Sequence, residues 1–290
     1  MEGMTHAPRS HSSGPGPVVV KVGGTLLDEP ERHRATLDGI VLLHESARRE
    51  GSGVILVHGG GVLVDRHLAR LGIVTERIDG IRVTPPEVVE EIVGVLAGRV
   101  NTRLVGLLAG SGARTVGLSL GDGGLCVCRK ATRYPFDPGA VGEIVDGDPS
   151  IAAALLGAGF LPVVSSIGLD AHGGFLNVNA DDAAAAVALV TGARELVLLT
   201  DVPGVFGPDG AVIPALDEDR MNALIADGTI AGGMIAKVRG ALDAARRARV
   251  PVTIASWKDP ASVLPARDGS KATCTRVLPA AAASLATARS

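Results

Sequence analysis

The chain has 290 residues, 46% of them hydrophobic, and it carries a formal net charge of −3. This length suffices for one large α/β domain or for two lobes. The near-neutral charge excludes the basic surface of a nucleic-acid-binding protein, and an aromatic content of 2% argues against base-stacking platforms. The three cysteines, Cys126, Cys128 and Cys274, form neither a disulfide framework nor a zinc pattern. We therefore expect reduced, buried thiols in a cytoplasmic protein.

The N-terminal residues 1–16 are polar and rich in proline, glycine and serine. They lack the apolar segment of a signal peptide, so we expect a disordered tail. No run of 18 residues is both apolar and uncharged, and we therefore expect no membrane span.

Apolar, β-branched runs alternate with helical patterns along the rest of the chain. The predicted strands are Val18–Val22, Val54–His58, Pro162–Ser166, Leu196–Thr200, Pro251–Ser256 and Thr273–Val277. Most of these runs are apolar throughout, which is typical of central strands in a parallel sheet covered on both faces. The pattern predicts an α/β fold with a mainly parallel central sheet.

The predicted helices fall between these strands. They are Glu31–Glu50, Val62–Leu71, Pro85–Ala97, Arg99–Gly110, Ser150–Leu156, Asp181–Thr191, Met221–Asp227 and Gly232–Ala248. Thr84, with Pro85 and Glu87 behind it, predicts a capping box at one helix start. The negative charge of residues Asp217 to Asp219 predicts a second helix start.

Two segments alternate more regularly and contain glycine turns. Arg114–Arg129 and Gly173–Asn179 are predicted as β-hairpins on the edge of the main sheet. We expect a boundary near Thr191, which gives an N-terminal lobe over 17–191 and a C-terminal lobe over 192–290. Because no long linker is present, we expect the two lobes to share one sheet.

The first chemical motif follows the first predicted strand. Lys21 is followed by Gly23 and Gly24, so a mobile cation stands beside backbone N–H groups that can close on an anion. A strand, a glycine-rich turn and a helix together hold phosphate. The sequence contains neither the P-loop pattern nor the dinucleotide fingerprint after a strand. A surface lysine beside a tight turn is the alternative for this motif alone.

A second glycine turn, Gly59–Gly61, follows the strand Val54–His58 and precedes a helix. Three glycines weaken a helix start unless the backbone must approach a ligand, so Gly59 and Gly60 are predicted to bind one. His58 could serve as a general base, but a histidine packed at a strand end is the interpretation that we prefer.

Polar side chains follow two further elements. Arg82 lies in a loop before a helix, where it could grip a carboxylate or form a surface ion pair. Asn177 and Asn179 share one face of a strand, and Asp181 begins the next helix. This cluster could simply cap the helix, or an asparagine could bind substrate while Asp181 offsets the repulsion between two lysines.

The C-terminal part contains two more candidate segments. The segment Thr200, Asp201, Val202, Pro203, Gly204 and Val205 follows the strand Leu196–Leu199. It lies at the carboxyl end of a parallel strand, where α/β sheets bind ligands. A plain proline–glycine turn is the alternative. Thr229, Ile230 and Ala231 lead into the glycine-rich helix start that carries Lys237, and such a start suits a nucleotide phosphate.

Taken together, these motifs resemble the acetylglutamate kinases of the amino-acid-kinase family from about Val18 to Val277. The motifs are K-V-G-G, H-G-G-G, D-G-I-R-V-T, N-V-N-A-D, L-T-D-V-P-G-V and G-G-M-I-A-K, in the family's order and spacing. Further segments, Val116–Gly123, Val163–Gly168 and Ile254–Trp257, resemble the short, arginine-insensitive dimeric branch. The resemblance implies a three-layer αβα sandwich with two lobes.

The resemblance also implies a role for each matching residue. Lys21 and Lys237 would stabilise the transferring phosphoryl group, and Asp181 would organise both lysines. Gly23, Gly24, Gly59 and Gly60 would supply backbone donors, Arg82 and Asn177 would bind the substrate carboxylate, and Thr200–Val205 with Thr229–Ala231 would line the nucleotide site.

The implied reaction is transfer of the γ-phosphoryl group of ATP to the side-chain carboxylate of N-acetyl-L-glutamate. A carboxylate is already ionised at neutral pH, so the reaction needs no general base. Mg²⁺ would arrive with the nucleotide rather than at a protein metal site, and a homodimer is implied. Two alternatives stay open: a kinase of the same fold for glutamate, aspartate, carbamate or acetylated aminoadipate, and a non-catalytic amino-acid sensor.

Overall fold

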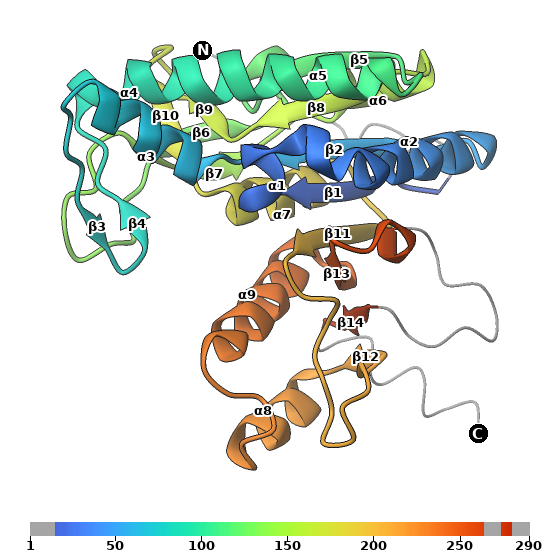
Figure 1. Cartoon of the computed structure of the whole chain (residues 1–290). Coiled ribbons are helices and arrows are strands. Elements are labelled where there is room, and N and C mark those ends of the chain that lie inside the picture. Colours follow the sequence, from blue (N-terminus) through green and yellow to red (C-terminus); the bar gives the residue numbers. More distant parts are fainter. Residues whose placement is uncertain (1–14, 264–273, 280–290) are drawn as a thin grey trace, which may run out of the picture.

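The computed structural model describes residues 15–263 and 274–279, so nearly all of the expected N-terminal tail lies outside the described residues. A central eight-stranded sheet has the strand order β12-β14-β13-β11-β1-β2-β8-β5 (Figure 1). Its strands are β1 (Val18–Val22), β2 (Val54–His58), β5 (Thr115–Ser119), β8 (Leu161–Ser165), β11 (Glu195–Thr200), β12 (Ala215–Leu216), β13 (Val252–Ser256) and β14 (Thr275–Val277). All neighbours pair in parallel except β13 and β14. The predicted parallel sheet is confirmed.

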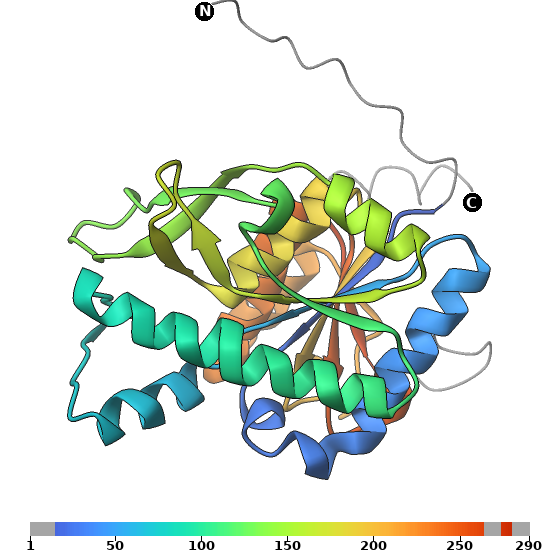
Figure 2. The ribbon, with the colours of Figure 1, turned by 90° about the horizontal axis from the view of Figure 1, so that it is seen from above.

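Helices cover both faces of this sheet (Figure 2). One face packs on α1 (Thr25–Asp28), α2 (Arg34–Arg49), α3 (Gly61–Arg70), α4 (Pro86–Val93), the π-helical turn η2 (Gly94–Val100) and α5 (Asn101–Gly110). The other packs on α6 (Ser150–Gly157), α7 (Ala180–Val190), α8 (Glu218–Ala226) and α9 (Gly233–Ala248). Short 3-10 turns are η1 (Pro30–His33), η3 (Asp122–Gly124) and η4 (Pro260–Val263). These are the three layers of an αβα sandwich.

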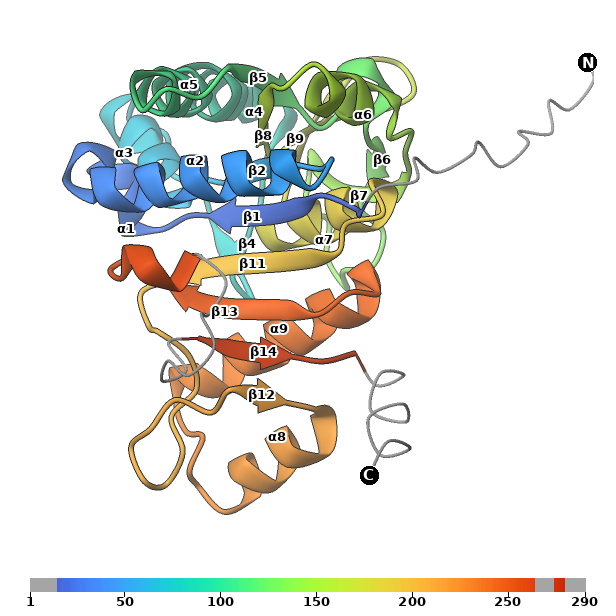
Figure 3. The ribbon, with the colours of Figure 1, turned by 90° about the vertical axis from the view of Figure 1, so that its right-hand side faces the viewer.

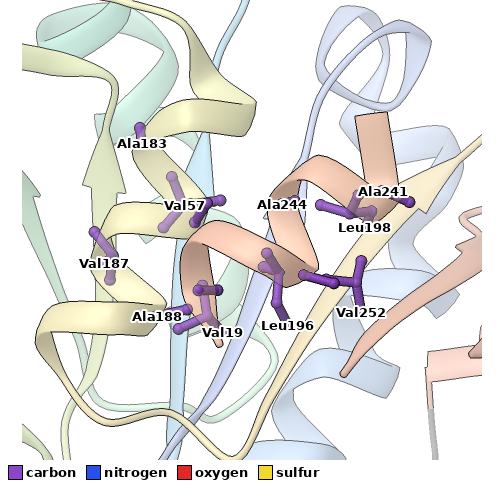
Figure 4. Packing of buried hydrophobic residues seen from close by; sticks show 14 of the residues in the cluster. Val19, Val57, Ala183, Val187, Ala188, Leu196, Leu198, Ala241, Ala244 and Val252 are labelled. Carbon is purple, nitrogen blue, oxygen red and sulfur yellow. The ribbon is translucent and has the colours of Figure 1, made fainter. Parts of the chain in front are cut away.

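The continuous apolar runs arise because successive strand residues face opposite layers. Val19 packs against α7 and α9, whereas its neighbours Val18 and Val20 pack toward α2. Figure 4 shows the first of these cores, in which Ala188 of α7 and Ala244 of α9 meet the sheet. Alanine on both helices lets their backbones lie close to the strands.

The main sheet runs without interruption through the expected lobe boundary near Thr191. β1 pairs with β2 on one side and with β11 on the other, and Figure 3 shows these strands stacked in one continuous layer. The segments before and after this expected boundary therefore share one sheet.

The predicted hairpin over Arg114–Arg129 is wrong. β5 is a parallel edge strand of the main sheet, whereas β6 (Val127–Lys130) belongs to a separate four-stranded sheet of order β6-β7-β10-β9. The remaining strands there are β7 (Val141–Asp146), β9 (Ile167–Leu169) and β10 (Phe175–Val178). β9 and β10 do form an antiparallel hairpin, but in this second sheet rather than on the main sheet's edge. A third sheet pairs β3 (Arg77–Ile78) with β4 (Ile81–Arg82).

The two helices predicted over Pro85–Gly110 form one helix, Pro86–Gly110, which continues through η2. Thr84 does not cap it: the Thr84 hydroxyl donates to the carbonyl of Arg82 instead, at 3.0 Å. Among the described residues this helix alone is long and apolar enough to cross a membrane by length and composition. Core helices of globular proteins meet the same criteria, and this one packs against α2 and β5.

Other helix boundaries follow the predictions closely. Asp217 accepts a hydrogen bond from the N–H of Arg220 at 2.8 Å and so caps α8, which confirms the helix start predicted from the acidic residues. The helix predicted over Glu31–Glu50 instead begins with η1, and α2 starts at Arg34.

Candidate active site

The predicted binding segments gather at the carboxyl edge of the central sheet. Because β1, β2 and β11 run in parallel, the segments after them lie at the same edge. These segments are the glycine turn after β1, the glycine turn after β2 and the Thr200–Val205 loop after β11. Lys21 lies opposite Val57 of β2 and Leu198 of β11 in the sheet register.

Lys21 forms an ion pair with Asp181 in the first turn of α7. Their Nζ–Oδ1 distance is 2.9 Å, and the lysine side chain is 18% exposed. The ammonium group lies over Gly23, because a Cβ added there would be 3.3 Å from Nζ. Glycine thus leaves room for the lysine head above the turn. The positive φ of Gly24, 59°, is a conformation that glycine adopts without strain.

Lys237 lies in the second turn of α9 and pairs with Asp201 at 2.5 Å. The hydrogen bond from Lys237 holds the pKa of the Asp201 carboxyl below its ordinary value. Asp181 therefore contacts one of the two lysines that it was expected to organise, and Asp201 contacts the other. Both ion pairs stand at the carboxyl edge, where α7 and α9 begin.

The glycines after β2 allow a close approach of backbone to neighbouring elements. A Cβ on Gly59 would lie 2.9 Å from the Cβ of Ala180 at the start of α7. A Cβ on Gly60 would lie 2.8 Å from Leu96 of η2, and Gly60 has a φ of 153° that other residues rarely adopt. The turn therefore fits tightly between two helices, with its backbone along the cavity described below.

His58 has a structural position, in agreement with the preferred interpretation. It is fully buried, its Nδ1 donates to the carbonyl of Gly59 at 2.9 Å, and its Nε2 accepts from Asn101 at 3.1 Å. Burial lowers the pKa of His58 to about 4, so the imidazole is neutral at physiological pH. Asn101 also donates to the carbonyl of Val163 and ties β2 to β8 beneath the glycine turn.

Arg82 is buried beside the same turn, with a side chain that is 5% exposed. Its Nη1 donates to Asp65 at 2.5 Å and to Thr75 at 3.0 Å, and its Nη2 donates to the carbonyl of Gly61 at 3.0 Å. Burial alone would raise the pKa of Asp65, but hydrogen bonds from Arg82 and Arg77 lower it overall. The Nε–H and one N–H of Nη2 have no hydrogen-bond partner among the described residues, and such a pair can hold a carboxylate.

A small cavity of about 140 Å³ brings these groups together. Its lining residues come from the glycine turn, β4, η2, β10 and the start of α7, and they include Gly59, Gly60, Arg82, Asn177 and Asn179. Asn177 donates to the Thr84 hydroxyl at 3.2 Å. Asn179 caps α7 by accepting from the N–H groups of Asp181 and Asp182. The capping interpretation of Asn179 is confirmed, and the same residue also lines the cavity.

The predicted nucleotide segments supply mainly backbone. Thr200 folds onto its own loop by hydrogen bonds with Val202, and the N–H of Val205 donates to Thr275. The side chains of Val205 and Ile230 are buried in the hydrophobic core, so only their backbone could contact a ligand. Gly204 is buried and Pro203 and Thr229 are half-buried, while Asp201 and Ala231 are exposed at the edge.

Sequence reasoning missed the residues that hold the site in place. Asp65 and Thr75 fix Arg82, Asn101 supports His58, and Tyr134 lines the cavity from a distant loop. Asn101 is a polar residue in an apolar helical stretch, and this was the available signal. The others look like ordinary surface residues, because their partners are brought close only by the fold.

This arrangement can neutralise a polyanion and hold a small acid beside it. Lysines and N–H groups at helix starts stabilise phosphate, and a buried arginine in the wall of a small cavity suits a carboxylate. The described residues hold no group of three or more His, Cys, Asp or Glu side chains that could bind a metal ion. Mg²⁺ commonly needs only one or two carboxylates besides substrate phosphates, so Asp181 and Asp201 are a chemically adequate set for a nucleotide-borne ion.

Fold and site together define a class: α/β phosphotransferases that act at the carboxyl edge of an αβα sandwich. The chain belongs to the amino acid kinase family, whose model matches residues 16–256.

Curated relatives and solved structures agree with this assignment. The chain is 44% identical to "Acetylglutamate kinase" of Moritella profunda over 84% of this chain and 90% of that protein. It is 43% identical to "Acetylglutamate kinase" of Vibrio cholerae over 91% of this chain and 97% of that protein. The carbamate kinase structure from Giardia matches with a TM-score of 0.60 and 16% identity, over 92% of this chain and 99% of that one, and so shows the same fold.

Proposed function

We infer that this protein transfers the γ-phosphoryl group of ATP to the side-chain carboxylate of N-acetyl-L-glutamate, a step of arginine biosynthesis. The observation that carries this inference is the cavity beside the Lys21–Asp181 pair, with buried Arg82 in its wall. Relatives of 43–44% identity that bear the acetylglutamate kinase name support the choice of acceptor.

We propose the following division of labour among the site residues. Arg82 and Asn177 hold the acceptor, and the N–H groups of Gly59 and Gly60 line its reacting end. Lys21 and Lys237 exchange their carboxylate partners for phosphoryl oxygens as ATP binds. Gly23 and Gly24 supply backbone donors, and the segments Thr200–Val205 and Thr229–Ala231 form walls of the nucleotide site.

Catalysis in this scheme rests on positioning and charge neutralisation. The acceptor carboxylate attacks the γ-phosphorus in line, and ADP leaves. Phosphoryl transfer of this kind spreads charge over the equatorial oxygens, which two lysines and backbone N–H groups stabilise. We propose that Mg²⁺ is bound with the nucleotide, where it would neutralise charge on the phosphates. His58 has no part, since the acceptor is already ionised.

The test is an acceptor screen with hydroxylamine to trap the acyl phosphate. N-acetyl-L-glutamate, glutamate, aspartate, carbamate and acetylated aminoadipate are compared at equal concentration with ATP and Mg²⁺. We expect the highest kcat/KM with N-acetyl-L-glutamate. A higher value with another acceptor would reassign the substrate, and acceptor-independent ATP turnover or none at all would contradict the proposal.

We further propose a cytoplasmic homodimer. The solvent side of helix 86–110 carries small residues, including Gly98, Gly106 and Ala109, which would let a second copy approach closely. Light scattering should give twice the chain mass of 29.4 kDa at micromolar concentration. A single-chain mass at that concentration would contradict the dimer.

A further inference from the structure

The loop between β6 and β7, residues 131–140, brings the chain's one tyrosine to the acceptor cavity. Tyr134 lines this cavity together with Arg82 and Asn177, and it is the aromatic residue of the lining. The rest of the lining comes from strands, helices, the glycine turn after β2 and the turn between β3 and β4. The 131–140 loop therefore contributes one residue, Tyr134, to the lining of the pocket.

Backbone hydrogen bonds fix the far end of this loop against the site. Thr84 donates its N–H to the carbonyl of Pro138 at 2.9 Å, and Ala140 donates to the carbonyl of Thr84 at 2.6 Å. Gly139 has a φ of 72°, and a Cβ there would lie 2.1 Å from the carbonyl oxygen of Thr84. The loop is thus held beside the segment that contains Arg82.

The tyrosine hydroxyl is held by a chain of polar contacts that reaches α7 and α9. Arg133 donates to the Tyr134 Oη at 2.9 Å and pairs with Asp182 in α7. Asp182 also pairs with Arg247 of α9, at 2.5 Å. Asp182 directly follows Asp181, the partner of Lys21. The position of the ring is therefore tied to the helix that meets the catalytic lysine.

We propose that Tyr134 determines acceptor specificity, its ring forming the wall that limits the length of the acceptor, and that Arg133 positions it. The inference rests on the proposed function. An aromatic ring suits this task because it presents a large rigid surface with few rotamers. The pocket then favours an N-acylated acidic amino acid with two side-chain methylenes over a homologue with three.

Truncation of the ring tests the wall directly. For Tyr134→Ala we expect the KM for N-acetyl-L-glutamate to rise about tenfold. The ratio of kcat/KM for N-acetyl-L-2-aminoadipate to kcat/KM for N-acetyl-L-glutamate should also rise about tenfold or more, because one methylene in a pocket discriminates by this factor. The KM for ATP should stay within about twofold. Tyr134→Phe keeps the ring and should retain most of the discrimination.

Phe175→Ala is the matched control, because it removes an exposed aromatic ring from the same small sheet outside the cavity. It should leave both KM values and the acceptor ratio unchanged. An acceptor ratio in Tyr134→Ala that equals the wild-type ratio would overturn the inference. Failure of the proposed function itself is seen separately, as a wild-type enzyme that makes no acyl phosphate from N-acetyl-L-glutamate.

Arg133 is a positioning residue in this scheme, so its effect must pass through Tyr134. Arg133→Gln should shift the acceptor ratio in the same direction as Tyr134→Ala, and adding it to Tyr134→Ala should change nothing further. Arg247 contacts the same Asp182 carboxylate but not the tyrosine, so Arg247→Gln should leave the acceptor ratio unchanged. Additive effects of Arg133→Gln and Tyr134→Ala would overturn the positioning role.

Discussion

The proposed acceptor half of the site and the proposed nucleotide half are built differently. In the acceptor half, Arg82 is buried and held by Asp65, Thr75 and a backbone carbonyl, and His58 is fully buried beneath the glycine turn. In the nucleotide half, Lys237 and Asp201 are 36% and 56% exposed and pair chiefly with each other.

This difference indicates two strategies for binding anions. Buried groups held by several hydrogen bonds are preorganised, so an acceptor meets a finished pocket with little reorganisation. An exposed lysine–carboxylate pair is worth little by itself and exchanges readily for a phosphate. Lys21 stands between the two cases, since its ammonium is mostly covered yet pairs with an exposed carboxylate.

The largest effects should come from the two lysines, Lys21 between the two halves and Lys237 in the nucleotide half. Lys21→Ala and Lys237→Ala should each lower kcat by roughly 10²–10³-fold, as expected for the loss of one oriented donor to the transition state. Steady-state kinetics with hydroxylamine trapping measures this.

Arg32→Ala is the control for loss of a cation, because Arg32 pairs with Glu29 on the surface. It should retain full turnover. Wild-type kcat in both lysine variants would contradict the assignment of the lysines to the reacting phosphoryl group.

The buried framework of the acceptor half should make its stability depend on pH. The pKa of His58 is about 4 in the folded protein and has its ordinary value of 6.5 when unfolded. Between pH 4 and pH 6.5 only the unfolded chain binds the proton. The contribution of His58 to the free energy of unfolding is therefore fully present above pH 6.5, and it falls by about 3 kcal/mol as the pH drops to 4. Urea unfolding from pH 7 to pH 4 measures the slope.

The His58→Gln variant should lose about 3 kcal/mol less stability than the wild type between pH 7 and pH 4. This difference does not depend on how stable the variant is at pH 7. His172→Gln is the control, since His172 is exposed at the β9–β10 turn and should leave the slope unchanged. An identical slope in the His58 variant would show that this imidazole titrates normally.

A smaller effect is expected from Arg82→Lys, which keeps the charge and loses the fork geometry. The KM for the acceptor should rise about tenfold, because one charge-assisted hydrogen bond is lost. The kcat and the KM for ATP should change little. Initial-rate kinetics with each substrate varied in turn separates these constants.

Arg129→Lys, at a surface pair with Glu143, should be silent in the same assay. If Arg82→Lys raised the KM for ATP instead, Arg82 would belong to the nucleotide half and the contrast between the halves would be wrong.

Local pattern predicted much of the fold and failed in identifiable places. Val18–Val22 and Val54–His58 match their predicted bounds because both faces of a central parallel strand are buried, which leaves an unbroken apolar run. Thr84 has the sequence of a helix cap, but its hydroxyl donates to the carbonyl of Arg82 at the end of β4 instead. The second strand of the predicted Arg114–Arg129 hairpin pairs with β7, whose position no local signal gives.

The sequence by itself determined the chemistry of the protein: which strands end in glycine turns, which lysines and carboxylates follow them, and the family to which they belong. Only the tertiary structure decided which carboxylate meets which lysine, that Arg82 is buried, and that Tyr134 stands at the cavity. The physical reason is the distance along the sequence over which each kind of interaction acts. Strand and turn preferences act between neighbours in the chain, whereas ion pairs and pocket walls form between residues that only the packing of a continuous sheet brings together.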